Sequence, residues 1–208
     1  WTPTAAGNNY DWNAATSNWG SGFPSEAGDV ANLNNNIAGN QTVRLQQDIT
    51  IGTLNLGDAD GSHSFTVSSG SGSNTLTFDS GSAAEPAYLN VTNAGTVTHT
   101  VSAGISLNSD LVVALPSGSD EANRPNLTFS GPININGKQL ILTGGYVPTS
   151  GGDFNQLWVT GGDTLIGNGT IINNGDSPLV LNGVKTSFTG KFILNGQGKG
   201  GSHTSTLT

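Results

Sequence analysis

The feature that most constrains the fold is a short apolar–x–apolar pattern that recurs along the chain at a nearly constant interval. The pairs that carry this pattern are Val43–Leu45, Phe65–Val67, Leu89–Val91, Leu111–Val113, Ile133–Ile135, Leu157–Val159 and Leu179–Leu181. Successive pairs are separated by 22 or 24 residues. An apolar residue at every second position is typical of a strand with one buried face. A fixed period of this size is typical of a solenoid whose stacked coils share one core.

This ladder predicts an all-β fold, specifically a right-handed parallel β-helix with about 22–24 residues per coil. A β-sandwich is the structural alternative, since its strands also recur about every 8–12 residues. A sandwich gives no long-range register, so the ladder favours the β-helix. We expect the solenoid over residues 29–208 and a capping segment over residues 1–28, the two together forming one domain.

The first 28 residues differ from the rest because they contain three of the four tryptophans. The aromatic residues in this segment are Trp1, Tyr10, Trp12, Trp19 and Phe23. The open end of a solenoid exposes its core and needs an atypical cap, and aromatic side chains suit that task because each buries a large area. We interpret this segment as a cap, with a sugar-binding aromatic cluster as the alternative.

Composition excludes several classes of function. The 208 residues contain no cysteine, which excludes disulfides and thiolate chemistry. Six basic residues against 14 acidic ones give a net charge of −8, and six scattered Lys and Arg do not make the basic patch that nucleic acids need. No apolar run approaches the ~20 residues of a membrane-spanning helix. We therefore expect neither a nucleic-acid nor a membrane partner.

If the ladder members point inward, the residues beside them form columns on one flat outer face. Trp158 is the first candidate for ligand binding, because an outward Trp in the middle of a strand is costly to leave in water. Tyr88 is the second aromatic candidate, since an aromatic ring can stack on the apolar face of a sugar. The remaining candidates are Asn90, Asp110, Asn134, Asn136, Gln156 and Tyr146. The alternative for Trp158 is packing beneath the loop 144–155.

Catalytic groups are sparse on this expected face. A glycoside hydrolase needs two facing carboxylates, and a lyase needs a base and positive charge near the substrate. Asp110 and Arg44 are the one acid and the one base expected there. We therefore predict no catalytic residues and expect that the chain is not an enzyme.

One short segment resembles the start of a calcium-binding loop. In Asp58-Ala59-Asp60-Gly61 the carboxylates stand at alternate positions and a glycine provides the bend. No Glu follows at the closing position, so a plain Asp-Gly turn is the alternative. We expect no cofactor apart from this calcium candidate at Asp58 and Asp60.

Two short motifs resemble parts of secreted bacterial proteins. The tail from Leu181 to Gly196 contains Asn-Gly, then Phe-Thr-Gly and a strand, and it resembles the autotransporter-associated β-strand repeat. The opening resembles the first coil that precedes such repeats, on Trp12, Trp19, Pro24 and Gly28-Asp29-Val30-Ala31. These resemblances imply a bacterial β-helix that works outside the cell or at its surface.

The whole pattern is also similar to the β-helical carbohydrate-binding modules of family 89, which are attached to plant cell-wall xylanases. The similarity rests on the length, the aromatic start, the coils rich in Asn, Gly and Ser, and the lack of catalytic groups. It implies non-catalytic binding of a plant cell-wall polysaccharide, with xylan as the ligand, by a monomeric module tethered to a secreted glycoside hydrolase. The alternatives are a structural or adhesive passenger segment of a bacterial surface protein and a polysaccharide lyase or hydrolase domain.

Overall fold

The computed structural model describes residues 1–5, 7, 9–92, 95–118, 123–146, 157–160, 165–176, 178–182 and 187–195. These residues form 20 strands in three parallel sheets, together with one short helix, α1 (Ala15–Asn18). Within this part of the chain, no helix has the length and apolar character that crossing a membrane requires. The all-β prediction is confirmed.

We call the three sheets A, B and C. Sheet A contains β1 (Asn9–Asp11), β3 (Gln41–Arg44), β6 (Phe65–Ser68), β9 (Thr98–Val101), β12 (Asn126–Phe129), β15 (Leu157–Thr160) and β18 (Leu179–Asn182). Sheet B contains β2 (Val30–Leu33), β5 (Thr53–Leu56), β8 (Ala87–Val91), β11 (Leu111–Gly118), β14 (Gln139–Tyr146), β17 (Thr170–Asn173) and β20 (Lys191–Leu194). Sheet C contains β4 (Ile49–Ile51), β7 (Thr75–Phe78), β10 (Gly104–Leu107), β13 (Ile133–Asn134), β16 (Leu165–Gly167) and β19 (Ser187–Phe188).

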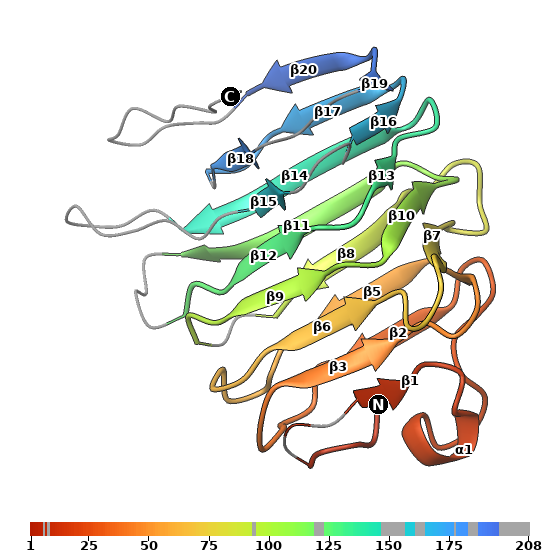
Figure 1. Ribbon diagram of the computed structural model, residues 1–208. Coiled ribbons are helices and arrows are strands. Elements are labelled where there is room, and N and C mark those ends of the chain that lie inside the picture. The colour runs from red at the N-terminus through yellow and green to blue at the C-terminus, as the bar shows by residue number, and fades with distance from the viewer. Residues whose placement is uncertain are drawn as a thin grey trace.

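From β3 onward the chain visits the sheets in the repeating order A, C, B. Each circuit lies on the preceding one, so strands far apart in the sequence become parallel neighbours, as Figure 1 shows for β3, β6 and β9. Three parallel sheets visited in rotation are the arrangement expected of a parallel β-helix.

The predicted coil length of 22–24 residues is wrong, because the number of residues between stacked strands varies along the chain. Asn55 bonds to Asn32 across 23 residues, but Asn90 bonds to Asn55 across 35. The corners between sheets C and B account for most of the difference. Gly52 alone connects β4 to β5, at a place where a Cβ atom would lie 2.7 Å from the Cα of Gly28. Residues 79–86 fill the same corner one circuit later.

The core is formed by every second residue of the strands, as the alternation predicts. In β3, β6 and β7 the buried positions alternate strictly with half-buried ones. A continuous apolar cluster runs from Trp12 at one end to Leu181 at the other. Each fully buried Leu, Ile or Val in it contributes about 1.5–3 kcal/mol of transfer free energy, so the stacked coils stabilise one another through this shared core.

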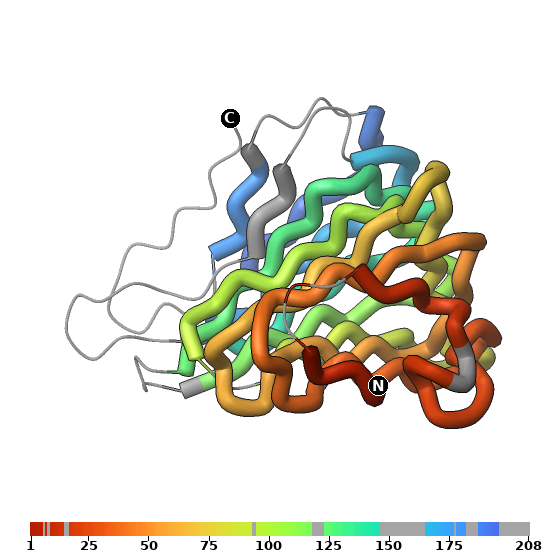
Figure 2. The backbone as a smooth tube through the Cα atoms, turned by 60° about the horizontal axis from the view of Figure 1, so that its bottom comes forward, coloured from red at the N-terminus to blue at the C-terminus, as the bar shows by residue number. Residues whose placement is uncertain are grey.

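The aromatic segment at the N-terminus packs against the first coils. Trp12 is fully buried, and Trp1, Trp19 and Phe23 pack against the core. The segment also extends sheet A, because β1 pairs with β3 (Figure 2). The indole N–H of Trp1 donates to the Gln41 side-chain oxygen at 3.0 Å. These contacts agree with a capping role, and a fully buried Trp12 offers no free ring face to a sugar.

Candidate ligand-binding face

The expected single flat face is wrong, because its residues lie on three different sheets. Tyr88 and Asn90 belong to β8 of sheet B. Trp158 belongs to β15 of sheet A, where its Cα lies opposite Thr128 and Val180. Asn134 belongs to β13 of sheet C. The three sheets form different sides of the solenoid, so these positions do not share one flat face.

Some candidates lie outside the described part of the structure. Gln156 is one of them, and the side chains of Trp158 and Tyr146 also lie outside it. The backbone of Tyr146 is described and ends β14 of sheet B. Ligand binding by these three side chains therefore stays a prediction.

Asn134 and Asn136 shape a turn at the end of β13. The Asn134 side-chain oxygen accepts a hydrogen bond from the Asn136 backbone N–H at 3.1 Å. Asn136 has a φ of 52°, in the left-handed region that Asn tolerates better than most residues. Its side-chain N–H donates to the Leu107 carbonyl at 3.1 Å. Both amides are thus engaged in holding the corner.

The outer face of sheet B carries a column of mostly apolar residues, which we call the apolar column. Its members lie opposite one another in successive strands: Val30, Thr53, Tyr88, Val112, Ile141, Ile172 and Ile193. Val30, Tyr88 and Ile193 are 50%, 37% and 38% exposed. With ~4.8 Å between neighbouring strands, the column is roughly 29 Å long. Six of its seven residues are apolar on a surface that faces solvent.

Two residues further along the same strands, asparagine side chains form a second column, the asparagine ladder. The Asn55 side-chain N–H donates to the Asn32 oxygen at 2.7 Å, and Asn90 donates to Asn55 at 2.8 Å. The ladder is interrupted after Asn90 and resumes where the Asn195 side-chain N–H donates to the Asn174 side-chain oxygen at 2.9 Å. Each amide in a ladder keeps donor and acceptor capacity for a further partner. The ladder therefore places a row of polar groups beside the apolar column.

The outer faces of sheets A and C are different. In sheet A the matching positions are Asn9, Thr42, Thr66, Thr100, Thr128, Trp158 and Val180. In sheet C they are Thr50, Thr77, Ser106, Asn134, Ile166 and Ser187. These faces present mainly hydroxyl groups, which need no partner other than water. Among the described strands, sheet B is thus the sheet whose outer column is mainly apolar.

Asn55→Ala is expected to lower the free energy of unfolding by about 1–2 kcal/mol, because it removes the middle of the ladder and two side-chain hydrogen bonds. Urea unfolding would measure the change. Asn34→Ala is the control, since Asn34 is exposed in the loop that follows β2. An equal loss in both variants would contradict a structural role for the ladder.

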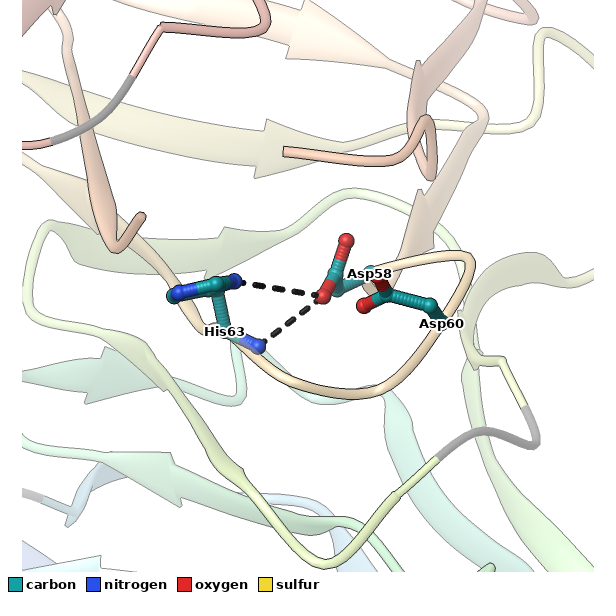
Figure 3. Close-up of side chains that lie close together, drawn as sticks. All are labelled: Asp58, Asp60 and His63. Carbon is teal, nitrogen blue, oxygen red and sulfur yellow. Dashed lines mark hydrogen bonds and ion pairs between the residues drawn. The ribbon is translucent and has the colours of Figure 1, made fainter. Parts of the chain in front are cut away.

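The calcium candidates lie in the loop between β5 and β6 (Figure 3). Ligand atoms of Asp58, Asp60 and His63 lie within 4.8 Å of one another. Asp58 is buried, and its oxygens accept backbone N–H groups of Ile37 at 3.0 Å and of Ser62 and His63 at 2.9 Å. Through these bonds the carboxylate caps the loop.

Asp60 is held in the same way at the surface. The Ser62 hydroxyl donates to its carboxylate at 2.6 Å, and the Ser62 backbone N–H donates at 3.0 Å. These hydrogen bonds, the hydroxyl first, lower the pKa of Asp60 to about 2. The loop is held as a turn by these bonds, and calcium binding at Asp58 and Asp60 stays a prediction.

Asp110 lies just before β11, at the corner between sheets C and B. One of its oxygens accepts the Gln139 backbone N–H at 2.9 Å. Asp110 also lines a hollow of about 640 Å³ together with Asp79, Glu85 and Lys138. The apolar ladder gives no sign of this hollow, because its 22–24-residue spacing hides the long corner 79–86.

Comparison of the chain with protein-family models, with curated proteins and with solved structures gave no match. The function of the chain is therefore inferred from its geometry and from the resemblances in its sequence.

Proposed function

We propose that the chain binds a plant cell-wall polysaccharide along the outer face of sheet B, with xylan as the preferred ligand. The observation that carries this proposal is the apolar column beside the asparagine ladder. A sugar ring has apolar C–H faces and polar hydroxyl groups at its edge. The column offers an apolar surface for the ring faces, and the ladder offers amides for the hydroxyls.

Tyr88 is the central contact in this proposal. It lies near the middle of the apolar column, between Thr53 and Val112, and its side chain is 37% exposed. A phenol ring can stack on a sugar while its hydroxyl stays in water. Because equivalent positions repeat in every strand, an extended polymer can make several weak contacts at once and gain affinity by multivalency.

Binding is proposed to occur without cleavage. Asp79 and Asp110 accept hydrogen bonds from the backbone N–H groups of Gly81 and Gln139, both at 2.9 Å, so both carboxylates serve the fold. Glu85 is exposed, whereas the general acid of a glycoside hydrolase works in an environment that favours its protonated form. We assign the chain the role of a monomeric module of a secreted bacterial glycoside hydrolase, where it would hold the catalytic domain near its substrate.

For the fold, we propose the right-handed winding that is nearly universal when parallel strands are joined by crossovers. The aromatic segment over residues 1–28 is proposed as the cap of this solenoid. Its support is the full burial of Trp12 and the packing of Trp1 and Trp19 on the core.

Tyr88→Ala is expected to weaken binding about 10- to 100-fold, since the lost aromatic contact is worth about 1.5–3 kcal/mol. Affinity electrophoresis in gels that contain xylan, mannan, β-glucan or pectin would measure the effect as lost retardation. We expect retardation by xylan and none by pectin, whose negative charge the acidic chain repels. Ile166→Ala is the matched control, because Ile166 is 36% exposed on the outer face of sheet C.

The outcomes separate the alternatives. Retardation that survives Tyr88→Ala but is lost in Trp158→Ala would move the site to sheet A. No retardation of the wild-type chain by any of the four polymers would overturn the proposal and favour the structural passenger segment. Shortening of the polymer during incubation would favour a hydrolase or lyase.

A further inference from the structure

The hollow at the corner between sheets C and B lies directly beside the apolar column. Ile141 belongs to both, because it lines the hollow and occupies the column between Val112 and Ile172. Asp110 lines the hollow and immediately precedes β11, the strand that carries Val112. A polymer that lies on the column therefore passes the mouth of the hollow.

The long corner 79–86 forms one wall of the hollow, and its own hydrogen bonds hold it in shape. The Ser80 hydroxyl donates to the carbonyl of Ser82 or of Glu85, both at 2.7 Å. The Ser109 hydroxyl, which is almost fully buried, accepts the Ser80 backbone N–H at 3.0 Å. The wall is thus organised before a ligand arrives, which reduces the entropy cost of binding.

The chemistry of the hollow selects against anions. Asp79, Glu85 and Asp110 contribute three carboxylates, and Lys138 contributes the one positive charge among the lining residues. Carboxylates accept hydrogen bonds from hydroxyl groups and repel other carboxylates. Ala84 and Ile141 add an apolar surface. The volume of about 640 Å³ lies within the range of about 300–1,000 Å³ that is usual for small-ligand sites.

We propose that this hollow receives a neutral monosaccharide branch of the polysaccharide whose backbone lies on the apolar column. This inference rests on the proposed function and adds its substrate class: polymers with neutral side sugars are preferred over unbranched polymers and over polymers substituted with uronic acids. The branch hydroxyls donate to Glu85 and to the oxygen lone pairs of Asp79 and Asp110 that their backbone hydrogen bonds leave open. The C–H face of the branch contacts Ala84 and Ile141.

The test is calorimetric titration with oligosaccharides of equal backbone length. Xylo-oligosaccharides are used unsubstituted, arabinose-substituted and glucuronic acid-substituted, and manno-oligosaccharides are used unsubstituted and galactose-substituted. We expect the neutral branch to raise affinity at least tenfold over the unsubstituted backbone in the series that binds. We expect the glucuronic acid branch to give no gain.

Two variants locate the effect in the hollow. Ala84→Phe fills it and is expected to lower affinity for the branched ligand to that of the unsubstituted one, which itself stays unchanged. Ala59→Phe is the control, because Ala59 is exposed in the loop between β5 and β6. Glu85→Lys, at an exposed position, is expected to raise affinity for the glucuronic acid-substituted ligand at least threefold.

The failure of this proposal differs from the failure of the proposed function. Equal binding of branched and unbranched ligands by the wild-type chain would overturn the branch site and leave polysaccharide binding in place. A branch preference that survives Ala84→Phe would place the branch elsewhere and overturn it as well. No binding of either series would overturn both proposals.

Discussion

Trp12→Ala is expected to lower the free energy of unfolding by about 3–5 kcal/mol, the usual cost of replacing a buried Trp or Phe by Ala. Trp12 has no exposed surface, and its indole N–H donates to the Pro24 carbonyl at 2.8 Å. Its ring also packs on Trp19, with 4.9 Å between the centroids. The substitution therefore opens a cavity at the end of the core and leaves the carbonyl of the half-buried Pro24 without its donor. Urea unfolding followed by Trp fluorescence would measure the loss.

Two control variants define what this result means. Trp12→Phe keeps an aromatic ring but loses the hydrogen bond to Pro24, so we expect an intermediate loss of about 1–2 kcal/mol. Tyr88→Ala removes a partly exposed ring and is expected to cost less than about 1 kcal/mol. If Trp12→Ala left stability unchanged and abolished polysaccharide retardation, the capping interpretation would be overturned in favour of the aromatic sugar site.

The strand pattern was predictable because it depends on local alternation alone. In Phe65–Val67 and Leu111–Val113 the two apolar residues are buried and the residue between them faces outward. Tyr88, Asn90 and Val112 were expected on an outer face, and all three lie on that of sheet B. Alternation decides which side of a strand is buried, whatever strand lies next to it.

The assignment of strands to sheets was not predictable from the same pattern. An apolar–x–apolar pair looks alike in sheets A, B and C, so only the connection lengths decide which strands stack. Val67 lies opposite Val101, not opposite a residue of Leu89–Val91. At this point the ladder passes from a strand of sheet A to a strand of sheet B. Its period looks constant only because the lengths of the loops happen to compensate.

The apolar column is also visible in the sequence, in a pattern that is not part of the apolar–x–apolar ladder. In Leu140-Ile141-Leu142 and Phe192-Ile193-Leu194 the outward residue is also apolar, so the strands read as continuous apolar runs. Such runs indicate strands that are covered on both faces. In β20 all four residues are exposed. In β14 only the outward Ile141 of its run is half-buried, and this run indicates a surface that a ligand can cover.

Acidification is expected to destabilise the chain through His99. This side chain is fully buried in β9, where its Nδ1 accepts the Phe65 backbone N–H at 3.1 Å. Burial lowers the pKa of His99 to about 4, against a smaller opposing effect of the Asp58 carboxylate. Protonation would also place an N–H of the imidazolium against the N–H of Phe65. The neutral ring is therefore the form that the folded chain accepts.

The direction of the effect follows from the two pKa values. In the unfolded chain the pKa of a His is about 6.5, so between about pH 6.5 and pH 4 the unfolded state binds the proton and the folded state does not. The contribution of His99 is complete above this window and is lost as pH falls through it, by about 3 kcal/mol in total. Urea midpoints measured from pH 8 to pH 3.5 would follow the loss.

His99→Asn separates this contribution from that of the carboxylates. Asn cannot titrate, and its side-chain oxygen can still accept the Phe65 N–H, so the variant is expected to lose less stability than the wild type between pH 6.5 and pH 4. His63→Asn is the control, because His63 is the other described histidine and is half-buried in the loop between β5 and β6. Identical pH profiles for the wild type and His99→Asn would contradict a neutral buried His99 and would place the acid sensitivity in other groups.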